Sequence, residues 1–260
     1  MGHMDQPTDA PTPTLEELEA ARTYYESLEP RDLFYRAATE LVDRAIREDT
    51  PLSLARGVLH RAIRDAAPLN LVEALAILLR TWNSAFYQFH HRTFDAKHFA
   101  DINKLVRRHR KSLLALRARS IESLSNADES EAKSLFAAFE EVLGPVGAAK
   151  SLHLIAPHFF PLWDRAIAEG YGLPMKPQGL NDDNYWQFMS ITREQCRLLG
   201  WGKAIRRNPL KAIDEFNYWR YTRKQPANPT GCDTTASAVR IRSSDVTRAR
   251  PQDSSSQSAI

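Results

Sequence analysis

Residues 143–172 read LGPVGAAKSLHLIAPHFFPLWDRAIAEGYG, and two breaks interrupt this helix-forming stretch. The first is Gly144-Pro145 and the second contains Pro157 and Pro161. Glycine permits backbone angles that other residues avoid, and proline suits a helix's first turn. The stretch therefore predicts three helices, joined first by a tight turn and then by a longer loop.

The rest of the chain also favours helices. It has 260 residues, 43% of them hydrophobic and only 10 of them glycine. Apolar residues recur at three- and four-residue spacing, as in Leu71, Leu75 and Leu78. Helices are predicted near 14–28, 31–48, 51–66, 69–91, 97–116, 129–142, 147–155, 164–170, 182–199 and 209–224. No strand-like alternation exceeds a few residues, so the predicted fold class is all-α.

The composition divides the chain into three parts. Residues 1–13 begin with the tag-like letters MGHM and are rich in Pro, Thr and Asp. Residues 226–260 are rich in Ser, Thr, Arg and Pro and hold few large apolar groups. Such segments bury too little surface to offset their ordering entropy, so both are predicted to be disordered. We expect one helical domain over 14–225.

Cysteine and histidine usage predicts no metal site and no cofactor. Cys196 and Cys232 lie far apart, which excludes a disulfide framework and favours a reducing, cytoplasmic setting. His153 and His158 lack further ligands at metal-binding spacing. No apolar run approaches the roughly 20 residues that cross a membrane, so no membrane partner is expected.

Two basic segments predict a polyanionic partner. Residues 104–119 contain seven Lys or Arg side chains and no acidic residue, and residues 203–224 interleave basic residues with aromatic ones. Phosphate contacts dominate nucleic-acid affinity, although charge runs are often only solvated helix faces. The candidate phosphate-binding residues of the first segment are Arg107, Arg108, Arg110 and Lys111.

The turn and the aspartate each have two interpretations. The turn is either an ordinary connection or an anion site, because amide N–H groups at a helix start suit a phosphate. Asp164 either caps the third helix or faces a cleft as a reactive carboxylate, and the two roles are compatible.

The order of these features resembles the helix-hairpin-helix DNA glycosylases. In that family the pattern Leu-Pro-Gly-Val-Gly-x-Lys precedes a Pro-Val-Asp motif. The matching residues here are Leu143-Gly-Pro-Val-Gly-Ala-Ala-Lys150 and then Pro161-Leu-Trp-Asp164. Pro and Gly are exchanged in the hairpin, and Lys150 lies one residue later than the family's lysine. The specific resemblance covers about 140–172 and extends loosely, by helix count and order, to 31–222.

The resemblance implies two helical lobes with a cleft that binds duplex DNA. The implied activity is excision of a damaged or modified base, which includes bulky bases and those of invading phage DNA. Asp164 would be the catalytic carboxylate, and Lys150 a cation in the cleft or a nucleophile. The implied DNA-binding hairpin residues are Gly144, Val146, Gly147 and Ala149.

A flipped base also needs a pocket, and the segment 80–91 is the best candidate in the sequence. Trp82 follows an apolar helical stripe, so core packing is an alternative role for its ring. Asn83 and Tyr87 lie on a neighbouring face, where Asn could read a base edge. Trp163 precedes Asp164 and completes the predicted pocket. Two other functions remain open: a non-catalytic helix-hairpin-helix DNA-binding module, and a helical interaction protein without a DNA role.

Overall fold

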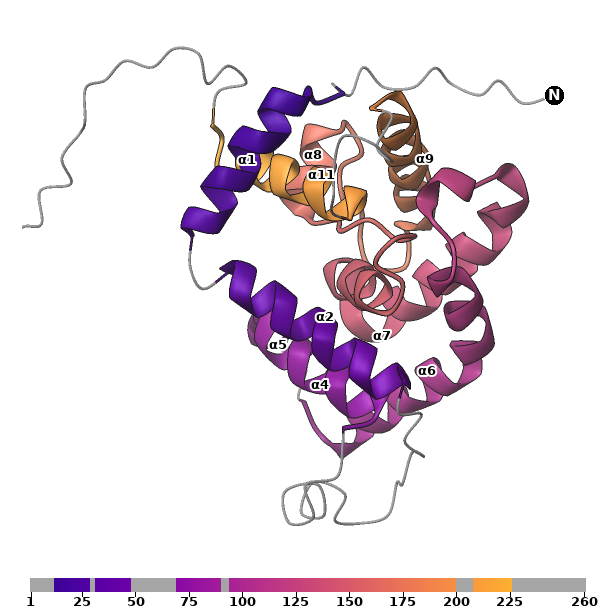
Figure 1. Ribbon diagram of the computed structural model, residues 1–260. Coiled ribbons are helices and arrows are strands. Elements are labelled where there is room, and N and C mark those ends of the chain that lie inside the picture. Colours follow the sequence, from indigo (N-terminus) through magenta and orange to yellow (C-terminus); the bar gives the residue numbers. More distant parts are fainter. Residues whose placement is uncertain (1–11, 29–30, 48–68, 90–93, 200–207, 226–260) are drawn as a thin grey trace, which may run out of the picture. The chain divides into compact units, whose positions relative to one another are not determined.

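Helices make up all the regular secondary structure in the part of the chain that the computed structural model describes (Figure 1). That part comprises residues 12–28, 31–47, 69–89, 94–199 and 208–225, all within the unit Met1–Pro229. Nine α-helices and no strand occur there, which confirms the all-α prediction. The predicted tails, the helix near 51–66 and the segment 200–207 fall wholly or mostly outside the described residues.

The N-terminal half begins with a capped helix. Thr14 accepts a hydrogen bond from the Glu17 amide, and the Glu17 carboxylate accepts one from the Thr14 amide, which makes the predicted capping box. The helices of this half are α1 (Leu15–Ser27), α2 (Arg31–Arg47), α4 (Leu71–Trp82), α5 (Ser84–Phe89) and α6 (Ala96–Arg117). The single helix predicted over 69–91 is thus two helices, because Asn83 leaves the helical conformation between them.

The C-terminal half is built around one long helix. Its helices are α7 (Glu129–Ile155), α8 (Arg165–Gly170), α9 (Asp182–Leu198) and α11 (Pro209–Asn217), followed by a π-helical turn over Tyr218–Thr222. Two short 3₁₀ turns, Ile121–Ser123 and Asn126–Asp128, precede α7. These bounds agree with the predicted helices, apart from the π turn at the end of 209–224 and the helices predicted over 129–142 and 147–155, which form the single element α7.

Packing brings the two ends of the helical region together. Helix α1 lies against α11, and α2 lies against α4, while α7 contacts α2, α4, α5, α6 and α9 (Figure 1). An ionic contact supports the first pair, because Arg22 of α1 donates to Glu215 of α11 over 2.7 Å. The central position of α7 places its turn among helices from both halves of the sequence.

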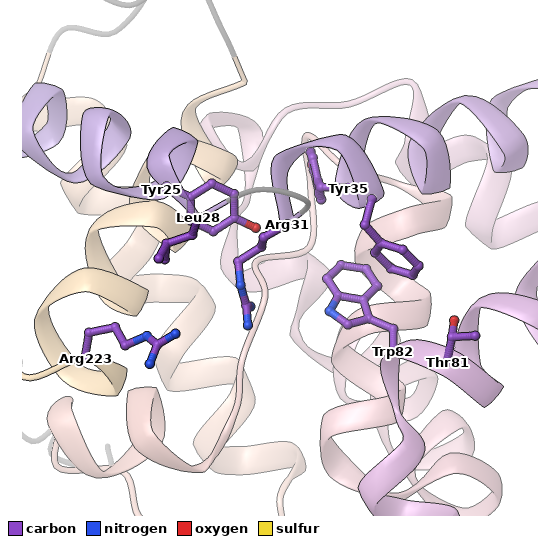
Figure 2. A pocket seen from close by; sticks show the side chains of 8 residues that line it. Tyr25, Leu28, Arg31, Tyr35, Thr81, Trp82 and Arg223 are labelled. Carbon is purple, nitrogen blue, oxygen red and sulfur yellow. The ribbon is translucent and has the colours of Figure 1, made fainter. Parts of the chain in front are cut away.

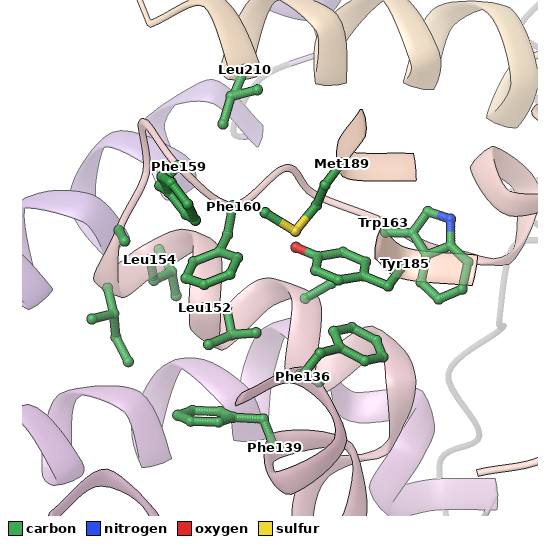
Figure 3. Packing of buried hydrophobic residues seen from close by; sticks show 14 of the residues in the cluster. Phe136, Phe139, Leu152, Leu154, Phe159, Phe160, Trp163, Tyr185, Met189 and Leu210 are labelled. Carbon is green, nitrogen blue, oxygen red and sulfur yellow. The ribbon is translucent and has the colours of Figure 1, made fainter. Parts of the chain in front are cut away.

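Aromatic side chains fill the core around the second half of α7 (Figure 3). Trp163 is 1% exposed and lies against Phe136 and Tyr185, with ring centroids 6.0 and 5.7 Å away. Because this packing is tight, the loop that leads to α8 has little freedom. The core therefore fixes where Asp164, the residue after Trp163, emerges.

Candidate functional site

The predicted hairpin turn is a break of one residue within α7. Gly144 has φ 69° and ψ 169°, while the chain is helical on both sides and Pro145 begins the second half. Only glycine adopts this backbone region without strain. The predicted break is confirmed, but it involves Gly144 alone, whereas the predicted helices over 129–142 and 147–155 leave residues 143–146 between them.

Side chains from two other segments hold this turn. Gln178 donates to the carbonyl oxygens of Glu140 and Glu141 over 2.9 and 2.8 Å. Asn83 donates to the Leu143 carbonyl over 3.2 Å. Carbonyls at the end of a helix lack intrahelical partners, so these bonds complete the first half of α7. The bond from Asn83 to the Leu143 carbonyl also explains why Asn83 separates α4 from α5.

A cavity of about 560 Å³ opens beside the turn, and we call it the hairpin cavity. Its wall includes Gly144, Val146 and Gly147, and the cationic residues Arg165 and Lys176 also line it. Of the predicted hairpin contacts, only Ala149 does not line this cavity; its side chain is buried in the core. The first turn of the second half of α7 therefore borders a space with positive charge.

Lys150 and Trp82 lie together at the edge of the hairpin cavity. The Lys150 Nζ donates to the Trp82 carbonyl over 2.6 Å and lies 5.2 Å from the centroid of the Trp82 ring. Burial lowers the pKa of Lys150 to about 8, although the negative charge of Asp164 acts in the opposite direction. Lys150 is thus a largely desolvated amine on an aromatic face.

Asp164 caps α8, as one of its two interpretations predicted. Its Oδ1 accepts a hydrogen bond from the Ile167 amide over 3.0 Å. The side chain is half-buried, and this burial raises its pKa, while the cap bond and the Lys150 charge lower it. The carboxylate is therefore part of the same electrostatic cluster as Lys150, and its catalytic role stays a prediction.

No pattern in the sequence indicates that the charge of a second carboxylate, Asp214, acts on this cluster. Asp214 raises the pKa of both Asp164 and Lys150. Its Oδ2 lies 2.6 Å from the Nζ of Lys211, which also sits over the rings of Tyr25 and Tyr35 at 3.9 and 4.4 Å. Lys211 was interpreted as part of a basic surface, but it is 5% exposed. The only local signal was the three-residue spacing of this Lys–Asp pair on a helix.

A second cavity, of about 470 Å³, also has Trp82 in its wall (Figure 2). We call it the aromatic cavity, and its lining residues are Tyr25, Leu28, Arg31, Phe34, Tyr35, Thr81, Trp82 and Arg223. Trp82 lines both cavities. Lys150, in contrast, lines only the hairpin cavity.

The structure separates the four residues predicted to form a base pocket. Trp82 and Asn83 line the hairpin cavity, whereas Tyr87 and Trp163 line neither cavity. Tyr87 is 8% exposed and its hydroxyl lies 3.1 Å from Nε2 of His98, so it joins α5 to α6. Trp163 belongs to the core described above. Both rings are engaged in packing, so a pocket at this site does not include them.

The basic run on α6 divides into a solvent-facing part and a structural part. Arg107, Arg108 and Lys111 are exposed, and Arg110 is half-buried. By contrast, Arg117 forms an ion pair with Asp43, and Arg119 pairs with Asp128 over 2.7 Å. The four residues predicted to contact phosphate therefore lie on the solvated portion of the helix.

His153 has a structural role in the described core. Its Nδ1–H donates to the Phe160 carbonyl over 2.7 Å, and the Tyr35 hydroxyl donates to its Nε2 over 2.8 Å. Burial lowers the pKa of His153 to about 4, so the ring is neutral at pH 7. Among the described residues, no group of three or more His, Cys, Asp or Glu side chains is placed to hold a metal ion.

None of the helices within the described ranges combines the length and apolar character that crossing a membrane requires. Comparison of the chain with protein-family models, with curated proteins and with solved structures finds no match.

Proposed function

We propose that this protein is a DNA glycosylase of the helix-hairpin-helix type, which hydrolyses the N-glycosidic bond of a damaged or modified base. The observation that carries the proposal is that Lys150 lines the hairpin cavity on the face of Trp82 and lies within electrostatic range of Asp164, which itself lines neither cavity. The break at Gly144, at the position of the hairpin in the sequence resemblance, supports the proposal.

The chemistry asks for a carboxylate beneath the sugar of an extruded nucleotide. Breaking the C1′–N bond leaves positive charge on the deoxyribose, and a fixed anion stabilises that charge. The base departs with the electron pair of the broken bond. A water oxygen then bonds to C1′, and the proton of that water passes to Asp164. Burial raises the pKa of Asp164, which favours its action as a proton acceptor. Lys150 serves as a cation of the cleft.

The hairpin supplies the phosphate anchor in this proposal. The first turn of the second half of α7 borders the hairpin cavity, where Arg165 and Lys176 add positive charge. A helix start and nearby cations together favour a DNA phosphate. Arg107, Arg108 and Lys111 on α6 offer further backbone contacts at their exposed positions.

The decisive experiment measures abasic sites in a panel of duplexes, each with one modified base, using wild type, Asp164→Asn and Asp164→Ala. Asparagine caps helices as well as aspartate, whereas alanine removes the cap at a cost of about 1 kcal/mol. We expect both variants to release base at least about 100-fold more slowly than wild type, with Asp164→Asn as stable as wild type. Equal rates for wild type and Asp164→Asn would remove this carboxylate from the mechanism.

A non-catalytic DNA-binding module is the second candidate. It is favoured by the bonds that already engage both reactive groups: Asp164 caps α8, and Lys150 donates to the Trp82 carbonyl. This candidate predicts salt-dependent duplex binding by wild type and no abasic product from any duplex of the panel. Binding that is negligible at both 50 and 200 mM salt would exclude both DNA-related functions.

A further inference from the structure

Two arginines share one aromatic ring at the aromatic cavity. The Cζ of Arg31 lies 4.3 Å from the centroid of the Tyr218 ring, and the Cζ of Arg223 lies 5.4 Å from the same centroid. Arg31 begins α2, and Arg223 follows the π turn, so the pair depends on the tertiary fold. Figure 2 shows both guanidinium groups on one side of the cavity and the indole of Trp82 on the other.

No carboxylate of the described residues neutralises this pair. No acidic residue is among the described residues that line the aromatic cavity, and neither guanidinium forms an ion pair with a described carboxylate. Other arginines of the same helices do form such pairs, as Arg36 does with Asp32 over 2.9 Å. Two adjacent unpaired cations repel each other, and a bound anion would relieve that repulsion.

The opposite wall suits a flat ring. Trp82 and Phe34 meet edge to face, with centroids 5.9 Å apart, and both line the cavity. Such surfaces bind aromatic ligands by stacking and by burial of apolar area. The cavity volume, about 470 Å³, lies within the range of about 300 to 1,000 Å³ that is usual for small-molecule sites.

We propose that the aromatic cavity binds a planar heteroaromatic ring that carries an anionic group, with the ring against Trp82 and the anion between Arg31 and Arg223. This inference deepens the proposed function. The ligand has two possible sources, and the inference rests on the proposed function only for the first of them. The first source is a base with an acidic substituent, turned out of DNA. The second is a free nucleotide, whose phosphate supplies the charge.

The position of the cavity connects it to the reactive cluster. Trp82 forms part of its wall and also carries Lys150 on its face. The charge of Arg31 contributes to the low pKa of Lys150, which places the two cations within electrostatic range. A ring seated on Trp82 therefore lies on the residue that carries Lys150, and for the first source the substrate class becomes a base with an acidic substituent.

The experiment compares matched ligands that differ in one anionic group. Duplexes with a central 5-carboxycytosine or 5-hydroxymethylcytosine test the first source, and deoxycytidine monophosphate against deoxycytidine tests the second. Binding is measured in Asp164→Asn protein so that the base stays attached. We expect the acidic member of at least one pair to bind about 10- to 100-fold more tightly.

The variants are Arg31→Ala, Arg223→Ala and, as a conservative change, Arg31→Lys. Arg197→Ala is the matched control, because Arg197 is an exposed arginine on α9 that lines neither cavity. Each alanine variant at the cavity should abolish the preference, Arg31→Lys should keep part of it, and Arg197→Ala should keep all of it. Thermal melts check that each variant is folded.

The outcomes separate this inference from the proposed function. A preference confined to the duplex pair assigns the DNA base, and one confined to the monophosphate assigns the free nucleotide. No preference in either pair, or one that survives both alanine substitutions at the cavity, overturns the inference. Tight binding of the acidic base without release by wild type would retain this inference and count against glycosylase activity. Release of neutral bases only would support glycosylase activity and would overturn the assignment of a DNA base with an acidic substituent.

Discussion

Substitution of Gly144 by alanine tests whether the turn in α7 depends on glycine for two separable reasons. The first reason is the backbone, because φ 69° with ψ 169° costs a residue with a side chain about 1 to 3 kcal/mol. The second is space, since an added Cβ would lie 2.7 Å from Cε2 of Phe86, a ring that is 8% exposed. Overpacking of this kind costs about 1 to 3 kcal/mol. The sum is about 2 to 6 kcal/mol.

Two further glycines separate these contributions. Gly179 has φ 91° and no atom within 4 Å of an added Cβ, so Gly179→Ala measures backbone strain alone, about 1 to 3 kcal/mol. In Gly147 a Cβ would meet the Asn83 Nδ2 at 2.6 Å, although the backbone is helical. Gly147→Ala therefore measures crowding, which the better helix propensity of alanine offsets by about 1 kcal/mol.

The assay is urea unfolding of the three variants and wild type, followed by far-ultraviolet circular dichroism. With a slope of about 2 to 3 kcal/mol per molar urea, Gly144→Ala should lower the midpoint by about 0.7 to 3 M. Its loss of unfolding free energy should exceed that of Gly179→Ala by the crowding contribution. Equal losses for these two variants would refute the argument that Phe86 closes the turn.

Three other predictions follow from the site. The triple variant Arg107→Ala, Arg108→Ala, Lys111→Ala should reduce the slope of log affinity for duplex DNA against log salt concentration by about 2 to 3. Arg197→Ala should leave this slope unchanged. Equal slopes for the triple variant and wild type would exclude α6 as a phosphate-binding face. The pKa of His153 is lowered to about 4 from an unfolded value near 6.5, so the unfolded chain binds more protons between these values. The stability contributed by the neutral ring should be complete above about pH 6.5 and should decline as the pH falls toward 4, by up to about 1.4 kcal/mol per pH unit. Unfolding measured at several pH values should show a smaller decline in His153→Asn than in wild type. Borohydride treatment with an abasic duplex should leave no covalent adduct, because Lys150 Nζ donates to the Trp82 carbonyl; an adduct that Lys150→Ala abolishes would assign a Schiff base to this lysine.

Local patterns in the sequence account for most of the helices. The capping box at Thr14 and the apolar spacing in α4 are properties of a few neighbouring residues, and the structure has both. The break at Gly144 is also local, since Gly-Pro cannot continue an ordinary helix. The division between α4 and α5 was not predictable in this way, because Asn83 bonds to a carbonyl 60 positions away.

The site shows the same difference between local and long-range information. Asp164 stands at the predicted start of a helix, which is why the sequence predicts that it caps this helix. The structure contains the cap bond, from the Ile167 amide to Asp164. The sequence also placed Lys211 in a basic run, yet contact with Asp214, Tyr25 and Tyr35 buries it. A run of charged residues shows only the composition of a helix. The burial of each side chain depends on which neighbouring helix covers that face.

The amino-acid sequence by itself thus determined the helical class, most helix ends and the turn that precedes Lys150, because backbone propensity and periodicity act over a few residues. Only the tertiary structure decided that Trp82 lines two cavities, that the charge of Asp214 acts on Asp164 and Lys150, and that Arg31 and Arg223 share the ring of Tyr218. These contacts join residues far apart in the chain. Their geometry follows from how whole helix faces pack against one another, which no local pattern records.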